Sequence, residues 1–253
     1  MTKHHITFLV IFCGLLIFSC EKKEKNSDNL MIVNGSIDGL RKGTLYLQKI
    51  QDTVLVNIDS IQINGIPNFE FRTPIETAEV FYLYLDKEDG DSLNDRILFF
   101  GEKGAIQIKT LLNTFESSAK IIGSKNQELL QEFNSFNRKF NDQNLDLMKK
   151  FYQSKIEGNP KLTDSLQQKM DNLLKRRYLY TINFAAQNTN ENIAPYLALT
   201  QVYNANISLL DSIALKMTEE VSNSKYGKEF LTFLERRRDQ DCLLYTSDAA
   251  DDS

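Results

Sequence analysis

Histidine, cysteine and tryptophan are nearly missing from this 253-residue sequence. There is no tryptophan, both histidines (His4 and His5) lie in the first five residues, and the three cysteines are Cys13, Cys20 and Cys242. Residues 21–241 therefore contain neither histidine nor cysteine. This excludes from that stretch a Ser-His-Asp or Cys-His nucleophile, a zinc site of the usual Cys/His kind and a disulfide framework. We expect the chain as given not to be an enzyme and to hold no cofactor and no metal.

An excess of charge of one sign is missing as well. Residues 20–241 contain 29 Lys and Arg against 31 Asp and Glu, which gives a net charge of −2. Nucleic acid is not the expected partner of an exported chain with this balance, and the basic clusters 175–177 and 236–238 are interpreted as solvated helix faces. A hydrolase built on two carboxylates is a further hypothesis, but no spacing singles out one acidic pair.

The first nineteen residues have the pattern of an export signal. Lys3, His4 and His5 precede an apolar run at 6–18, which is shorter than the roughly 20 residues of a membrane-spanning helix. Ser19 then precedes Cys20, and this junction resembles a bacterial lipobox, in which the new N-terminal cysteine carries acyl chains. We expect residues 1–19 to be a signal peptide, Cys20 to be lipidated and residues 20–29 to be a polar tether. A secretory signal followed by a coincidental cysteine is the alternative.

The last twelve residues, 242–253, are also excluded from the interpretation of the fold. The run from Cys242 to Asp252 resembles the translation of a sequencing adapter, so we expect residues 242–253 to be an artefact that interrupts the reading frame near Asp241. A natural tail rich in alanine and aspartate is the alternative. The interpretation of the fold is accordingly limited to residues 30–241.

Residues 30–123 have the pattern of an antiparallel β domain. Short runs rich in β-branched and aromatic residues recur with turn residues between them. They lie at 31–37, 44–49, 54–63, 69–72, 80–85, 96–100, 105–110 and 119–122. Asn64-Gly65 and the segment 101–104 predict hairpin turns. We expect a sheet sandwich or a barrel-like domain.

From Ser124 onward the apolar spacing becomes helical. Gly158-Asn159-Pro160 interrupts the pattern, which predicts two long helices packed as an antiparallel hairpin, followed by shorter helices at 193–203, 209–221 and 225–238. The predicted fold class is α+β, with an α-helical domain at 124–241. A stripe of Phe133, Phe136, Phe140 and Phe151 is interpreted as the packing seam of the hairpin. A groove for a partner, a lipid or a second copy is the alternative.

Two local patterns invite a chemical interpretation that their details do not support. The acidic residues in 86–91 gather as in a calcium loop, but Ile97 occupies the position of the bidentate glutamate, so a solvated loop is favoured. Ser117 with Lys120, and Ser222 with Lys225, match the Ser-x-x-Lys spacing of penicillin-recognising enzymes. The accompanying Lys-Thr-Gly is missing from the sequence, and we interpret both matches as coincidence.

Several short motifs, taken in order, resemble the domain of unknown function that opens many lipid-anchored thiol-disulfide oxidoreductases of Gram-negative bacteria. They are NGSI at 34–37, GTLYL at 43–47, IDS at 58–60, NG at 64–65, FEF at 69–71, IIGS at 121–124 with Asn126, and SKYGK at 224–228. Asp59 and Ser60 match the most recognisable dipeptide of the family, and we interpret them as a structural pair that sets a strand end. The segment 66–68 departs from the family pattern and predicts a longer hairpin loop.

In that family a TlpA-like thioredoxin domain with a W-C-x-x-C site follows the last helix, and no residue of this sequence corresponds to it. The resemblance therefore implies the non-catalytic anchor and presentation region of a truncated, lipid-anchored thiol-disulfide oxidoreductase that faces the periplasm. The expected partners are the membrane, through the lipid on Cys20, and envelope protein substrates or a second copy. A stand-alone envelope lipoprotein that binds a partner or ligand is the alternative.

Overall fold

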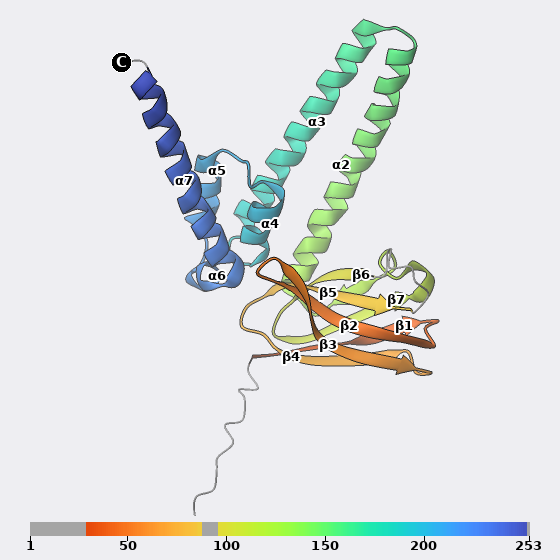
Figure 1. Ribbon diagram of the computed structural model, residues 1–253. Helices are drawn as coiled ribbons and strands as arrows, with labels where there is room; N and C mark the ends of the chain where they lie inside the picture. Colours follow the sequence, from red (N-terminus) through yellow and green to blue (C-terminus); the bar gives the residue numbers. More distant parts are fainter. Residues whose placement is uncertain (1–28, 88–95, 252–253) are drawn as a thin grey trace, which may run out of the picture.

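The computed structural model describes residues 29–87 and 96–251, with residues 240–251 described by their backbone alone (Figure 1). An N-terminal β region is followed by a helical region, which confirms the predicted α+β class. The strands are β1 (Leu30–Asp38), β2 (Lys42–Gln51), β3 (Val54–Asn64), β4 (Asn68–Pro74), β5 (Glu79–Asp86), β6 (Arg96–Gly101), β7 (Gly104–Leu111) and β8 (Lys120–Ile122). The helices are α2 (Lys125–Ile156), α3 (Pro160–Gln187), α4 (Ile193–Gln201), α5 (Ile207–Ala214), α6 (Glu219–Asn223) and α7 (Lys225–Asp251), with a 3-10 turn at Leu112–Thr114.

The strands form two four-stranded sheets that share one core. Their orders are β4-β1-β7-β8 and β3-β2-β5-β6. Alternate residues of each strand point inward, as Met31 and Val33 do on β1 and as Phe81 and Leu83 do on β5. This period of two is the pattern that made the strands recognisable in the sequence.

One strand pair differs from the antiparallel prediction. β1 and β7 run parallel, with Val33 opposite Ile106, whereas the other five pairings are antiparallel. A parallel pair needs a long connection, and the strands β2 to β6 provide it. The runs of apolar residues predicted the strands correctly but carried no information about this long-range pairing.

Both predicted hairpins are wrong. Asn64-Gly65 joins β3 to β4, and segment 101–104 joins β6 to β7, but in each case the two strands belong to different sheets. Gly65 does adopt a φ of 92°, as the turn requires. The segment 66–68 then crosses to the other sheet, where the Pro67 carbonyl accepts a hydrogen bond from the Ile37 amide at 3.0 Å. The tight hairpin within this part of the chain is instead β2–β3, where Gln51 pairs with Val54.

The long helical hairpin is confirmed. Ser124 begins α2 by accepting a hydrogen bond from the Gln127 amide, and Asn159 begins α3 by accepting one from the Leu162 amide. Pro160 occupies the first turn of α3, where its missing N–H costs nothing. Figure 1 shows the hairpin projecting away from the sheets, and only its base packs against other elements.

The expected single helix at 209–221 is two helices. α5 ends at Ala214, and Thr218 begins α6 by accepting a hydrogen bond from the Val221 amide at 3.3 Å. Thr218 followed by Glu219 and Glu220 is a helix-start signal that the apolar spacing alone concealed. α7 begins at Lys225 as predicted and continues through residues 242–251.

A second core joins the helices to the outer face of the sheet β3-β2-β5-β6. Val80 of β5 and Phe100 of β6 are buried in it together with Leu129, Ile193 and Phe230 from the helical region. The two regions are therefore packed against each other through apolar side chains, and the polar contacts described next lie at the edge of this packing.

Candidate functional site

A cleft of about 1370 Å³ lies where the β region meets the helical region, and we call it the interface cleft. Its walls come from the end of β2, the β4–β5 loop, the start of β5, α4 and the first turns of α7. The polar and aromatic side chains that line it include Lys49, Thr77, Glu79, Tyr82, Tyr196, Thr200, Lys225, Tyr226 and Glu229.

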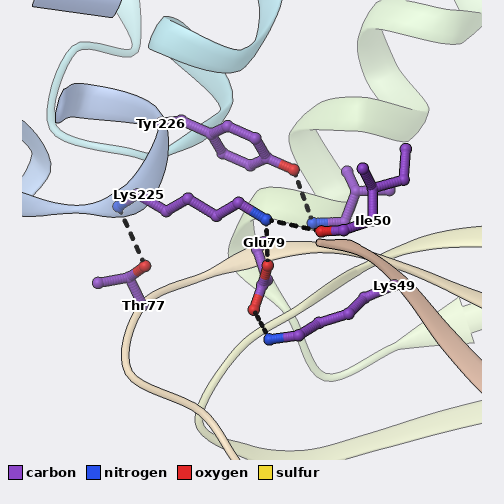
Figure 2. Close-up of polar contacts among 7 residues, drawn as sticks. Lys49, Ile50, Thr77, Glu79, Lys225 and Tyr226 are labelled. Carbon is purple, nitrogen blue, oxygen red and sulfur yellow. Dashed lines mark hydrogen bonds and ion pairs between the residues drawn. The ribbon is translucent and has the colours of Figure 1, made fainter. Parts of the chain in front are cut away.

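Glu79 lies at the centre of the polar contacts in this cleft. It is the first residue of β5, and only 7% of its surface is exposed. Its Oε1 accepts from Nζ of Lys49 at 2.9 Å, and its Oε2 accepts from Nζ of Lys225 at 2.6 Å (Figure 2). A carboxylate buried to this degree needs such partners, because an unpaired charge in a poorly hydrated site is strongly unfavourable.

The first two residues of α7 attach to the β region at several atoms. Lys225 also donates from Nζ to the Ile50 carbonyl at 3.2 Å and from its amide to Oγ1 of Thr77 at 3.3 Å (Figure 2). Oη of Tyr226 accepts from the Val80 amide at 3.0 Å. α7 is therefore held at its start by both strands of the β2–β5 pair.

The residues around the start of α7 hold α6 and α7 close together. Oγ of Ser224 accepts from the Gly227 amide at 3.1 Å and donates to the Val221 carbonyl at 2.6 Å. A Cβ atom on Gly227 would lie 1.9 Å from the Val221 carbonyl oxygen, so no larger residue fits without moving the backbone. Gly227 thus allows α6 and α7 to approach closely enough for Lys225 and Tyr226 to reach the strands.

A second helix start is attached to the neighbouring strand. Oε1 of Gln127, in the first turn of α2, accepts from the buried Phe100 amide at 2.8 Å. Asn126 donates from Nδ2 to Glu102 at 2.8 Å and to Glu191 at 3.3 Å, while its Oδ1 accepts from the Ile193 amide at 2.8 Å. Asn126 therefore joins the β6–β7 loop, α2 and the start of α4.

The rings in the cleft form one aromatic cluster. Tyr226 lies 5.2 Å from Tyr196 and 5.9 Å from Phe100, measured between ring centroids. Burial raises the pKa of Tyr196 to about 12 and also raises the pKa of Tyr226, so both hydroxyl groups stay protonated at neutral pH. Partial burial raises the pKa of the Glu229 carboxyl, which nearby Lys225 opposes. These groups are suited to hydrogen bonding and packing.

The interface cleft was not predicted as a site. Glu79 offered one signal, because it is the single charged residue in an otherwise apolar and aromatic run at 78–85. Lys225 and Tyr226 lie within SKYGK, whose signal is its resemblance to a family, and Lys225 also ends the Ser-x-x-Lys match that begins at Ser222. Their convergence depends on how β5 and α7 pack, which no local pattern encodes.

The predicted site residues have mixed outcomes. Cys20 and the signal peptide lie outside the described residues, and so do residues 88–91 of the acidic loop at 86–91. Oδ1 of Asp59 accepts from the Ser60 amide at 2.7 Å, which confirms its local bond to the backbone. The pair does not set a strand end, however, because it lies inside β3 beside an irregularity in the pairing at Leu47 and Gln48.

Three residues of the phenylalanine stripe pack within the hairpin, whereas the ring of Phe151 contacts that of its neighbour Tyr152, 5.6 Å away between centroids. Phe133, Phe136 and Phe140 all lie within 6.2 Å of the Tyr180 ring, between centroids, although Phe136 stays 38% exposed.

Two of the three arginines at 236–238 contact other elements and do not only face solvent. Arg237 donates to the Tyr203 carbonyl at 2.8 Å and Arg238 pairs with Asp211 at 2.5 Å, so α7 also holds the loop after α4 and the helix α5.

The described part of the chain contains no candidate membrane-spanning helix and no candidate metal site. Across 29–87 and 96–251, no helix combines the length and apolar character that crossing a membrane requires. Over 29–87 and 96–239, where side chains are described, no three residues of the types His, Cys, Asp and Glu gather in a way that would hold a metal ion.

Comparison with known families places a domain of unknown function, DUF4369, at residues 31–130. The match begins in β1, includes all the later strands and ends within the first turns of α2. It therefore contains Glu79, Val80, Phe100 and Gln127, but not Lys225 or Tyr226. No curated protein and no solved structure matches the chain significantly.

Proposed function

We propose that this chain is the non-catalytic anchor and presentation region of a thiol-disulfide oxidoreductase of the cell envelope. In this proposal Cys20 carries the lipid, residues 20–29 form the tether, and a thioredoxin-like domain follows Asp241 in the complete protein. Two findings support it: the DUF4369 domain, which contains most of the motifs of the resemblance, and the SKYGK motif at 224–228 outside it.

The observation that carries the presentation role is the attachment of α7 to β5. Lys225 and Tyr226 fix the first turn of the last helix to Glu79 and Val80, while Arg237 and Arg238 fix a later turn to the helices. A helix held at two places has a defined direction relative to the β region. A domain joined to its end would be held near the membrane, which raises its effective concentration toward envelope substrates.

The first test is to sequence the source gene through the codon for Asp241 and beyond, with long reads that contain no adapter. The proposal expects the reading frame to continue into a domain with a Cys-x-x-Cys motif. A stop codon directly after this point would contradict it.

A second test uses the complete gene product. Glu79→Gln combined with Tyr226→Phe should leave the reduction of a small soluble disulfide unchanged and should slow the reaction with envelope proteins on membranes. Equal slowing of both reactions would show that these residues do not act by positioning the redox domain.

The interface cleft favours a second candidate, a stand-alone lipoprotein that binds a partner or ligand. Its volume of about 1370 Å³ and its three tyrosines, Tyr82, Tyr196 and Tyr226, are properties of a binding site. A stop codon after Asp241 would make this the working hypothesis, because it needs no redox domain.

A further inference from the structure

We infer that the tip of the α2–α3 hairpin is a contact site for an anionic lipid surface. The hairpin tip is defined as residues 149–162, the last two turns of α2, the turn at 157–159 and the start of α3. This inference does not rest on the proposed function, and it is independent of any lipid on Cys20.

The hairpin tip is exposed and carries apolar side chains that contact little. Ile156 is 80% exposed, Tyr152 is 57% exposed and Leu162 is 41% exposed. Figure 1 places this tip at the end of the hairpin that points away from the sheets. Neither the sandwich core nor the core between sheet and helices includes a residue of the tip.

Basic residues outnumber acidic ones in the hairpin tip. The hairpin tip contains four lysines, Lys149, Lys150, Lys155 and Lys161, against the single acidic residue Glu157. The whole chain, by contrast, has a net charge of −4. The Glu157 carboxylate accepts from the Gln153 amide group at 2.8 Å. Among the described residues, none of the four lysines forms an ion pair, and Nζ of Lys155 lies 4.6 Å from the centroid of the Phe151 ring.

A shallow hollow beside the hairpin tip suits the phosphate of a lipid headgroup. It measures about 410 Å³ and is lined by Lys149, Lys150, Gln153, Ser154, Glu157 and Leu162. Lys149 and Lys150 supply two positive charges to this hollow against the one negative charge of Glu157, and the exposed Leu162 borders it. Isolated apolar side chains ringed by lysine are the composition that binds an anionic interface.

A folded acidic protein fits this tip less well. A specific protein interface buries about 800 Å² on each partner around a packed apolar centre. The hairpin tip is a narrow end of two helices with three well-exposed apolar side chains, Tyr152, Ile156 and Leu162. Contact at this end would also fix the orientation of the molecule on the surface, since the tip lies far from the β region (Figure 1).

The absence of tryptophan gives a direct test. The chain is prepared from residue 20 with Cys20→Ser, so that neither the apolar run at 6–18 nor an acyl chain contributes; all described strands and helices remain. Ile156→Trp places a single tryptophan at the hairpin tip. Leu174→Trp is the matched control, because Leu174 is 64% exposed on α3 but lies sixteen residues, roughly 24 Å of helix, from Gly158.

Vesicles of phosphatidylcholine containing about a third phosphatidylglycerol should shift the Ile156→Trp emission to shorter wavelength, and vesicles of phosphatidylcholine alone should not. Leu174→Trp should not shift with either. Lys150→Glu with Lys155→Glu should weaken co-sedimentation of the chain with anionic vesicles at least roughly tenfold, since each lysine near such a surface contributes about 1 kcal/mol. Lys175→Glu, on α3 but away from the hairpin tip, should weaken this co-sedimentation much less.

Three outcomes would overturn the inference. They are no binding to anionic vesicles, equal binding to neutral and anionic vesicles, and binding that Lys175→Glu weakens as much as the substitutions at the tip. In the first case, binding to soluble polyglutamate would assign the hairpin tip to an acidic protein instead. Circular dichroism of each variant confirms that the exposed substitutions leave the helices formed.

Discussion

Val80 and Phe100 lie opposite each other on β5 and β6, and the backbone amide of each donates to a side chain from a different helix. The Val80 amide donates to Oη of Tyr226 on α7, and the Phe100 amide donates to Oε1 of Gln127 on α2. Two helix starts that are separated by about 100 positions in the chain are therefore hydrogen-bonded to one pair of facing residues. This arrangement joins the β region to the helical region through hydrogen bonds as well as through apolar packing.

Removal of the Tyr226 hydroxyl tests one half of this arrangement. Tyr226→Phe keeps the ring in the aromatic cluster and leaves the Val80 amide without its acceptor, which should lower the free energy of unfolding by about 1–3 kcal/mol. Urea unfolding measures the loss, and amide hydrogen exchange should become faster at Val80 but not at Phe100. Tyr203→Phe is the control, because Tyr203 is 56% exposed. Equal effects of the two substitutions would contradict the assignment.

Glu79→Gln tests the ion pairs in the interface cleft. The amide keeps the shape of the side chain but cannot neutralise Lys49 and Lys225, so the variant should lose about 2 kcal/mol of stability. The loss is moderate because the lysine side chains are 29% and 33% exposed and stay partly hydrated. Glu76→Gln, in the neighbouring exposed loop, should change stability by less than about 0.5 kcal/mol. A Glu79→Gln variant as stable as the Glu76→Gln variant would show that the ion pairs of Glu79 do not stabilise the fold.

Gly227→Ala tests the close approach of α6 and α7. Its Cβ would lie 1.9 Å from the Val221 carbonyl oxygen, so the backbone must shift and the start of α7 must move from Thr77 and Glu79. We expect a loss of about 3 kcal/mol in urea unfolding, although alanine favours helices more than glycine does. Lys228→Ala, at the next and exposed position, should be nearly neutral. A stabilised Gly227→Ala variant would show that the two helices do not pack this closely.

The contacts of Asn126 with Glu102 and Glu191 predict a pH dependence. Burial raises the pKa of the Glu191 carboxyl above its ordinary value of 4.5, and Glu102 raises it further, whereas Lys125 and the bond from Asn126 oppose the shift. Because the pKa is higher in the folded chain, ionisation of Glu191 disfavours folding, and this cost is absent below about pH 4.5 and complete above the folded pKa. Glu191→Gln should therefore be more stable than the unsubstituted chain at pH 7, with the difference closing in acid. Urea unfolding across this range would contradict the prediction if the difference were constant or reversed.

The sequence was a good guide to elements with strong local periodicity. The apolar alternation around Val33 and Phe81 predicted strands, and Ser124 and Pro160 marked the starts of the two long helices correctly. These features depend on residues within a few positions of one another, so they can be read from the sequence without the fold.

Pairings between distant segments could not be read in this way. Asn64-Gly65 reverses the chain, but whether the next strand pairs with β3 or crosses to β1 depends on which faces are buried in the sandwich. The same limit applies to the interface cleft, where Glu79 and Lys225 meet across 146 positions. Ser224 and Gly227 mark the start of α7, yet neither residue indicates which strand that helix contacts.

The central claim is that α7 is held in one direction relative to the β region, and a distance distribution tests it most directly. Spin labels on Gln62→Cys in β3 and Arg236→Cys in α7 occupy exposed positions, and Cys20→Ser and Cys242→Ser in the chain from residue 20 remove the other thiols. Pulsed electron-electron double resonance should give one narrow distribution for this chain and a broader one after Glu79→Gln with Tyr226→Phe. A broad or multiple distribution in the chain that retains Glu79 and Tyr226 would contradict the account.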